Sequence, residues 1–189
     1  KAKIKRLKMD RENFKILPRM LCFLSIILMC NFHPAANLNT GSRMQERIKF
    51  ERFSIEDGLS QNTVYCILQD SRGFLWLGTE NGLDRCDGYG FKPYVSKPGD
   101  AGGLSGSTVL AMCEDRSGTL WVATSNGLNK FDRLNETFTR FKNNPQKSGS
   151  LSDDYILSIL EDNRGELWVG TCKGLNKYDK EKGTFDHWF

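Results

Sequence analysis

The stretch that decides the fold is DSRGFLWLGTENGLDRCD, which occupies residues 70–87. Two similar stretches follow, DRSGTLWVATSNGLNKFD at residues 115–132 and DNRGELWVGTCKGLNKYD at residues 162–179. The copies begin 45 and then 47 residues apart, and self-similarity at such a period indicates a repeat architecture. A tryptophan stands at the centre of each copy: Trp76, Trp121 and Trp168.

Within each copy, turn signals separate short apolar runs. The tetrapeptide D-x-x-G suits a type I turn, and the run FLWLGT at 74–79 that follows has the length of a strand. Asn-Gly at 81–82 and at 126–127 predicts two-residue hairpin turns, for which Lys-Gly at 173–174 is a weaker signal. Further strands are expected at 63–69 and at 91–95, where Pro93 suits an edge strand. Each copy is therefore predicted to be a four-stranded antiparallel meander.

A single meander cannot cover both of its faces, so its central strand, apolar on both sides, needs a neighbouring sheet on each. Radial stacking of sheets supplies these neighbours, which predicts an all-β fold, a partial β-propeller of three four-stranded blades. The blades are predicted at residues 54–95, 96–142 and 143–189. Residues 48–53, IKFERF, resemble a fourth strand and form a candidate ring-closing outer strand, whose own sheet is not among the three. We therefore expect a fragment of a longer protein with one bare sheet face at each end.

The N-terminal segment differs in composition from the rest. Residues 1–20 hold eight of the Lys and Arg residues, and residues 20–30, MLCFLSIILMC, are uncharged but too short for a full membrane span. Residues 1–36 are interpreted as a basic tail with a signal peptide or a signal-anchor helix, followed by a linker at 37–47. This order predicts export to the periplasm. The remaining residues hold 19 basic and 21 acidic side chains, which gives no electrostatic case for nucleic-acid binding.

The sequence shows no catalytic, cofactor or metal motif. The Asp residues of D-x-x-G lack the spacing of a calcium loop and are interpreted as turn caps. Adjacent carboxylates such as Glu114 and Asp115 are expected to point to opposite faces of a strand. The three central tryptophans are predicted to be core residues rather than sugar-stacking platforms. Four cysteines with no shared spacing are interpreted as small buried apolar residues: Cys66, Cys86, Cys113 and Cys172.

A ligand site is expected on one face of the blades. Strand direction alternates, so the hairpin turns after the second strands share a face with the loops between blades. Loops of differing sequence on a uniform scaffold are where recognition is expected. The candidate ligand-binding residues on this face are Asn62, Glu80, Asn81, Ser125, Asn126 and Lys173.

From about residue 50 to residue 189, the pattern I-x-D-G-L-S-x-N-x-V followed by D-x-x-G-x-L-W and T-x-x-G-L-[ND]-[RK]-[FY]-D resembles the two-component regulator propeller family. Cys86 stands where that family usually has an aromatic residue, and Ala123 where it has Gly. Such repeats form the periplasmic ligand-sensing part of membrane receptors that continue into a transmembrane helix and a histidine kinase, and many respond to glycans. The resemblance implies a non-catalytic sensor segment of a hybrid receptor anchored in the inner membrane.

The same resemblance implies the partners. They are a glycan or related small ligand and the rest of the receptor chain, with a homodimer left open and no nucleic acid for this segment. Two other classes remain open, a secreted propeller lyase or glycosidase acting on polysaccharide and a protein-interaction scaffold. The predicted first strands argue against the enzyme, because the residues they offer to a central axis are mainly Val64, Cys66, Val109, Ala111, Ile156 and Ser158.

Overall fold

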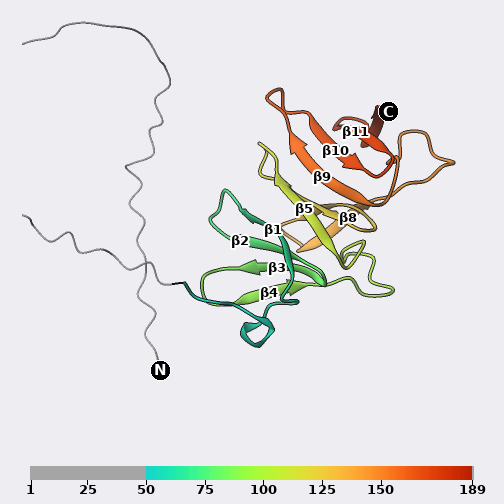
Figure 1. The fold of residues 1–189 in the computed structure, drawn as a ribbon. Coiled ribbons are helices and arrows are strands. Elements are labelled where there is room, and N and C mark those ends of the chain that lie inside the picture. The colour runs from blue at the N-terminus through green and yellow to red at the C-terminus, as the bar shows by residue number, and fades with distance from the viewer. Residues whose placement is uncertain (1–49, 189) are drawn as a thin grey trace, which may run out of the picture. The chain divides into compact units, whose positions relative to one another are not determined.

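The computed structural model describes residues 50–188, in which a short 3₁₀ helix, η1 (Ile55–Asp57), precedes twelve strands (Figure 1). The strands form three four-stranded antiparallel sheets, each built from four consecutive strands. Blade 1 holds β1 (Val64–Gln69), β2 (Leu75–Thr79), β3 (Gly82–Cys86) and β4 (Phe91–Tyr94). Blade 2 holds β5 (Val109–Glu114), β6 (Leu120–Thr124), β7 (Gly127–Asp132) and β8 (Thr137–Phe141). Blade 3 holds β9 (Ile156–Glu161), β10 (Leu167–Thr171), β11 (Gly174–Asp179) and β12 (Thr184–Trp188). The predicted all-β architecture of propeller blades is confirmed.

Both kinds of predicted turn form in every blade. The backbone N–H of Gly73 donates to the carbonyl of Asp70 over 2.9 Å, which closes the D-x-x-G turn between β1 and β2. The hairpin between β2 and β3 has a two-residue turn, but its residues are Glu80 and Asn81, one position before the predicted Asn81-Gly82 pair, and Gly82 begins β3 opposite Thr79. Gly82 is required there, because its φ is 135° and a Cβ would lie 2.6 Å from the carbonyl oxygen of Tyr94.

Two apolar cores lie between neighbouring blades. The first joins blades 1 and 2 and is built around Trp76, Leu83 and Phe131. The second joins blades 2 and 3 and is built around Trp121, Val169 and Phe185. Figure 1 shows the innermost strands β1, β5 and β9 following one another across the three sheets. Blade 2 is therefore the only one of the three described blades with a neighbour on each side.

The burial of the second strands follows from this arrangement. All five residues of β6 are buried, as predicted for a strand covered on both faces. In β2 and β10, by contrast, two of the five residues are exposed or half-buried. Blade 1 leaves Ile67 66% exposed, and blade 3 leaves Leu160 63% and Trp188 56% exposed. The expected bare sheet face is thus present at each end of the described blades.

Two sequence interpretations need correction or stay open. The four cysteines are free thiols, but their interpretation as buried residues is wrong. Cys66, Cys86 and Cys113 are only half-buried, and Cys172 is exposed in the turn after β10. Burial does affect Cys66, where it raises the pKa of the thiol to about 11. Residues 50–53 of the candidate ring-closing strand lie in no strand, and the sheet it would join is not among the described blades, so that role stays a prediction. The predicted signal segment and linker, residues 1–47, lie outside the described residues.

Candidate ligand-binding face

One face of the blades, here called the loop face, carries the β2–β3, β6–β7 and β10–β11 turns and the loops 95–108 and 142–155 between blades. Hydrogen bonds tie these segments together. The hydroxyl of Thr108 donates to the carbonyl of Glu80 over 3.2 Å, and the N–H of Gly127 donates to the carbonyl of Asp154 over 2.7 Å. The turns and loops therefore share one side, as the alternation of strand direction predicts.

Three of the predicted ligand-binding side chains are held by partners within the chain. The Oδ1 of Asn62 accepts from the N–H of Ile55 over 2.9 Å and so holds the start of η1. The Nδ2 of Asn126 donates to the carbonyl of Ser105 over 2.8 Å, and its Oδ1 accepts from Lys142 over 3.0 Å. The amides of Asn62 and Asn126 therefore position the loops, and the third side chain with a partner is Lys173.

The Lys173 ammonium lies 2.9 Å from a carboxylate oxygen of Asp153. The hydrogen bond from Lys173 to Asp153 and the negative charge of Asp153 raise the pKa of Lys173, and the same hydrogen bond lowers the pKa of Asp153. Because Lys173 is largely exposed, the pair fixes the direction of its side chain at little energetic gain.

The remaining predicted residues present their side chains to solvent. Glu80 and Asn81 are exposed at the tip of the first hairpin turn, and Ser125 is half-buried at the second. The backbone N–H of Asn81 donates to the Oγ1 of Thr79 over 3.2 Å, which orders the turn and leaves the amide side chain outside it. The structure thus brings the predicted residues to one face but spreads them over three hairpins and the segment before β1.

A cavity of about 670 Å³ opens on the loop face beside blade 3. Its lining comes from the loop between blades 2 and 3, from the β10–β11 turn and from β12. The lining residues are Asn143, Asn144, Pro145, Gln146, Lys147, Ser148, Gly149, Ser150, Ser152, Lys173 and His187. Amides, hydroxyls and ammonium groups dominate this list, and no Asp or Glu is in it, so the cavity offers many hydrogen-bond donors.

His187 is the lining residue that sequence reasoning missed. It pairs with Asn176 in the ladder between β11 and β12, and its Nε2 lies 2.6 Å from the carbonyl oxygen of Ser150. The sequence showed only a lone histidine near the end of the chain. Its place beside the loop 142–155 depends on the outer strand pairing, which carries no local signal at this position.

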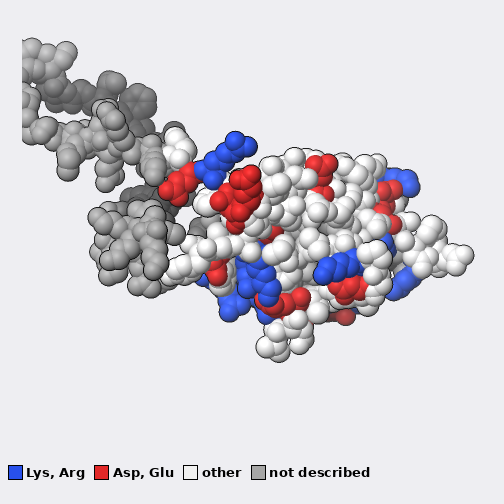
Figure 2. Space-filling model, turned by 90° about the horizontal axis from the view of Figure 1, so that it is seen from below, with Lys and Arg blue, Asp and Glu red and all other residues white. Residues whose placement is uncertain are grey.

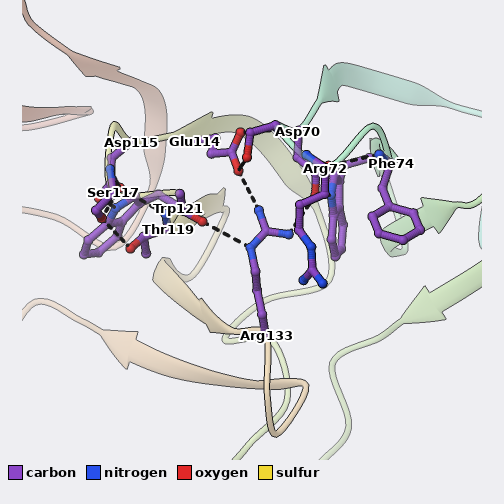
Figure 3. A network of polar contacts seen from close by, with 12 residues as sticks. Asp70, Arg72, Phe74, Glu114, Asp115, Ser117, Thr119, Trp121 and Arg133 are labelled. Carbon is purple, nitrogen blue, oxygen red and sulfur yellow. Dashed lines mark hydrogen bonds and ion pairs between the residues drawn. The ribbon is translucent and has the colours of Figure 1, made fainter.

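The opposite face, here called the turn face, carries the D-x-x-G turns and a network centred on Arg133 (Figure 3). The guanidinium donates to Asp70 of blade 1 over 2.7 Å and to Glu114 over 2.8 Å, while Nε donates to the carbonyl of Gly118. Glu114 also accepts from the backbone N–H and the hydroxyl of Ser71. Blades 1 and 2 are therefore linked through charged groups as well as through the apolar core.

A hydrogen bond from the central tryptophan to the turn aspartate recurs in each blade. The indole Nε1 donates to the aspartate Oδ2 over 2.9 Å from Trp76, 2.9 Å from Trp121 and 3.2 Å from Trp168. Burial raises the pKa of Asp70, but the hydrogen bonds from Trp76 and Arg133 outweigh it and leave that pKa below its usual value. Each turn aspartate therefore accepts hydrogen bonds both from the backbone of its turn and from the indole of the central tryptophan.

A second polar motif recurs where each blade begins. The backbone N–H of Ser105 donates to the Oδ1 of Asn129 over 2.9 Å, and the Ser105 hydroxyl contacts both the Asn129 amide and the Thr124 hydroxyl. Ser152, Thr171 and Asn176 repeat these contacts in blade 3. Blade 1 has Ser60 and Thr79, but the third position is a buried carboxylate, Asp84.

Charged side chains of both signs lie close together on the blades (Figure 2). Figure 2 shows acidic side chains beside basic ones on the side it presents, without a continuous basic stripe over the described blades. Within residues 50–188, no three His, Cys, Asp or Glu side chains gather as a metal ion would need. In the same range no helix reaches the length and apolarity that crossing a bilayer requires.

The blades are similar to known proteins. The family model described as two component regulator propeller matches residues 58–81, 103–126 and 150–173, once in each blade. The extracellular domain of a protein described as a hybrid two component system, BT3049 of B. thetaiotaomicron, is 32% identical with a TM-score of 0.68. That match covers 73% of this chain and 20% of the other.

A curated protein named Histidine kinase P4, from Formosa agariphila (strain DSM 15362 / KCTC 12365 / LMG 23005 / KMM 3901 / M-2Alg 35-1), is 48% identical over 52 residues, which cover 28% of this chain and 4% of the kinase. The chain therefore spans only a small part of the length of both relatives. The resemblance inferred from the motifs is confirmed, since three matches fall in three successive sheets. The family model described as two component regulator propeller thus matches a segment in each of the three blades of this chain.

Proposed function

We propose that residues 50–188 are part of the periplasmic ligand-sensing propeller of a two-component signalling receptor. The ligand is a glycan or a related small molecule bound on the loop face, and the blades perform no catalysis themselves. The parent receptor is anchored in the inner membrane, and its kinase domain transmits the signal when the blades bind the ligand.

The observation that carries this proposal is the 32% identity and TM-score of 0.68 to an extracellular domain of a hybrid two component system. The match takes in 73% of the chain, so it includes the loops as well as the strands. A histidine kinase relative supports the same class of parent protein. The match to a repeat family without catalytic motifs supports a sensing role over an enzymatic one.

The geometry of the loop face supports a polar small ligand. The cavity beside blade 3 is lined by amide, hydroxyl and ammonium groups such as those of Gln146, Ser152 and Lys173. Sugar hydroxyls both donate and accept hydrogen bonds, which suits a lining that mixes amides and hydroxyls. The volume of about 670 Å³ lies in the range of small-molecule sites.

Calorimetry on the full chain tests the ligand. A panel of neutral and uronate-bearing oligosaccharides is titrated into the wild-type chain and into the variants Gln146→Ala and His187→Ala. Arg164→Ala, an exposed change on the turn face, is the matched control. We expect at least one saccharide to bind, and each cavity variant to weaken it by roughly tenfold, the value of one lost hydrogen bond of about 1–1.5 kcal/mol. Absence of binding across the panel, or equal weakening by the control, contradicts the proposal.

Location is tested separately. Alkaline phosphatase fused after Phe189 is active only where the fusion leaves the cytoplasm. Activity in whole cells supports the periplasmic assignment. A stable fusion that stays inactive contradicts it.

A further inference from the structure

The two junctions between blades each contain a crevice, built from the same positions of the repeat. Each crevice lies between the outer strand of one blade (β4 or β8), the loop that follows it and the start of the next outer strand (β8 or β12). The first crevice, between blades 1 and 2, has a volume of about 220 Å³, and the second, between blades 2 and 3, has a volume of about 110 Å³. Because the two are equivalent in the repeat, each serves as the comparison for the other.

The backbone that frames the two crevices is the same. The N–H of Phe138 donates to the carbonyl of Gly102 over 2.7 Å, and the N–H of Phe185 donates to the carbonyl of Gly149 over 2.8 Å. Each connecting loop is therefore held against the outer strand of the next blade. The differences between the crevices lie in their side chains.

The first crevice has acidic residues in its lining. They are Asp100 and Glu136, beside one basic residue, Lys97. Glu136 has a φ of 53°, a left-handed conformation that costs free energy in a residue with a Cβ. Its carboxylate pairs with Arg85 over 3.3 Å and also with Lys92, both of blade 1. An ion-pair network between the blades therefore occupies this junction.

The second crevice has no acidic residue in its lining. Gly183 stands at the position of Glu136, with a similar φ of 67°, and Lys147 stands at the position of Asp100. The basic residues of the lining are Arg140, Lys142 and Lys147. The repeat has thus replaced two carboxylates by a glycine and a lysine on the same backbone.

Two of these cations have no carboxylate partner among the described residues. The Lys142 ammonium donates to the amide oxygen of Asn126 over 3.0 Å, and the exposed Lys147 ammonium makes no hydrogen bond or ion pair with another described residue. Lys173 differs from them, because Asp153 balances its charge. Two positive charges at the second crevice are therefore left for an anion.

The second crevice adjoins the cavity on the loop face. Four lining residues belong to both: Asn144, Lys147, Gly149 and Ser150. The cavity, at about 670 Å³, has the size of a small-molecule site, whereas the crevice, at about 110 Å³, has room for one substituent of a few heavy atoms. Lys147 is the cation that the two linings share.

We propose that the saccharide bound in the cavity carries an anionic substituent, a carboxylate or a sulfate, which the second crevice binds through Lys147 and Lys142. This inference rests on the function proposed above and names the class of its ligand. An ammonium donates to the oxygens of either anion, and hydrogen bonds between charged groups are stronger than neutral ones.

Calorimetry on the full chain with matched pairs of oligosaccharides tests the proposal. Each uronate-bearing oligosaccharide of the panel above is paired with its methyl ester, and sulfated galactan oligosaccharides are paired with their desulfated forms. We expect the charged member of at least one pair to bind about tenfold more tightly than its uncharged partner. The kind of pair that shows this difference distinguishes carboxylate from sulfate, and added salt should narrow the difference.

Variants at one position show whether the crevice causes the preference. Lys147→Gln should weaken binding of the charged member about tenfold and change that of the uncharged member by less than about twofold. Lys147→Asp, which introduces the residue type found at 100, should weaken the charged member further. The matched control is Lys97→Gln, which removes an exposed lysine from the first crevice and should change neither. Circular dichroism establishes that each variant is folded.

The outcomes separate this inference from the function on which it rests. Binding by uncharged members alone, or equal binding within every pair, overturns the inference and leaves the proposed function standing. Equal weakening of both members by Lys147→Gln, or equal weakening of the charged member by Lys97→Gln, also overturns it, because the charge at 147 is then not what the ligand contacts. Absence of binding by every saccharide contradicts the proposed function itself, and the inference falls with it.

Discussion

Replacing Asp84 by Asn should stabilise the chain, because the other two blades have Asn129 and Asn176 at this position. Asp84 is fully buried, with no ion-pair partner among the described residues. Its carboxylate accepts from the Ser60 backbone over 3.2 Å and from the Ser60 hydroxyl over 2.6 Å. Burial raises its pKa, and the hydrogen bonds from Ser60 only partly oppose this.

The magnitude follows from the amide at the same place in blade 2. The Asn129 Nδ2 donates to the carbonyl oxygens of Val122 and Gly127 over 3.1 Å and 3.3 Å. In blade 1 the corresponding carbonyls belong to Leu77 and Gly82, and a carboxylate cannot donate to them. Two new neutral hydrogen bonds are worth about 1–3 kcal/mol. They are offset by the loss of the charged hydrogen bond from the Ser60 hydroxyl to Asp84, which a neutral bond to the hydroxyl replaces, as from Asn129 to Ser105. We expect Asp84→Asn to raise the free energy of unfolding by about 1 kcal/mol at pH 7, or Tm by about 2–4 °C.

The gain should depend on pH with a definite sign. The pKa of Asp84 is higher in the folded chain than in the unfolded chain, so the folded state binds that proton more tightly. The destabilisation that the buried, ionised Asp84 causes in wild type is therefore lost as pH falls through the folded pKa toward the unfolded value. The advantage of Asp84→Asn should be largest above the folded pKa and shrink below it.

Thermal unfolding followed by circular dichroism from pH 4 to pH 8 measures both effects. The matched control is Asn129→Asp, which places a carboxylate in the same setting of blade 2 and should destabilise the chain, most at high pH. A lower Tm for Asp84→Asn at pH 7, or an advantage that is independent of pH, would refute the reasoning.

Two further predictions concern the turn face. Asp115→Ala removes the acceptor of the Trp121 indole and of two turn N–H groups, so we expect the free energy of unfolding in urea to fall by about 2–4 kcal/mol. The control Asp162→Ala should lose less, because its Trp168 is half-buried, and equal losses would contradict the role given to burial. Because hydrogen bonding holds the pKa of Asp115 below its usual value despite burial, this contribution should fade as pH drops below about 4. Arg133→Met should lower the free energy of unfolding by about 1–3 kcal/mol, most at low salt. Arg116→Met, a control at an exposed arginine, should lower it by less. An Arg133→Met variant as stable as wild type would show that the charged link between blades 1 and 2 does not stabilise the chain.

The strands and turns could be predicted from the sequence because their signals are local. The D-x-x-G turn and the Asn-Gly hairpin each need only four adjacent residues, and the apolar run around Trp76 needs six. The stacking of blades followed from one further step, since β6 is apolar on both faces and β6 is indeed buried throughout. The half-exposed Trp168 shows where that step depends on a neighbour that is not among the described blades.

The side-chain partners could not be predicted in the same way. The bond from Trp121 to Asp115 crosses a hairpin, and the bond from Ser105 to Asn129 joins residues 24 apart. The sequence does contain a signal for the second, because Ser and Asp or Asn recur at that same offset of 24 in all three blades. No such signal marks Arg133, whose counterparts in the other blades are Gly and Lys.

The candidate site shows the same division. Topology alone correctly places the hairpin turns beside the loops between blades. It does not tell that Asn126 and Lys173 already have partners, or that His187 comes to lie against the loop 142–155. Those facts depend on the conformation of loops whose sequences differ from blade to blade.

The polar motifs within each blade bear on how the chain folds as it is made. The Trp-to-Asp bond closes within six residues and the Ser-to-Asn bond within 24, and every buried side-chain nitrogen or oxygen of the described residues has a hydrogen-bond partner. A blade leaving the ribosome can therefore satisfy these two recurring motifs before the next blade is synthesised. Contacts of such short sequence separation favour rapid, sequential folding. Each finished sheet then offers its apolar face, around Trp76 or Trp121, as a template to the sheet that emerges next, so synthesis from the N-terminus sets the order in which the blades assemble.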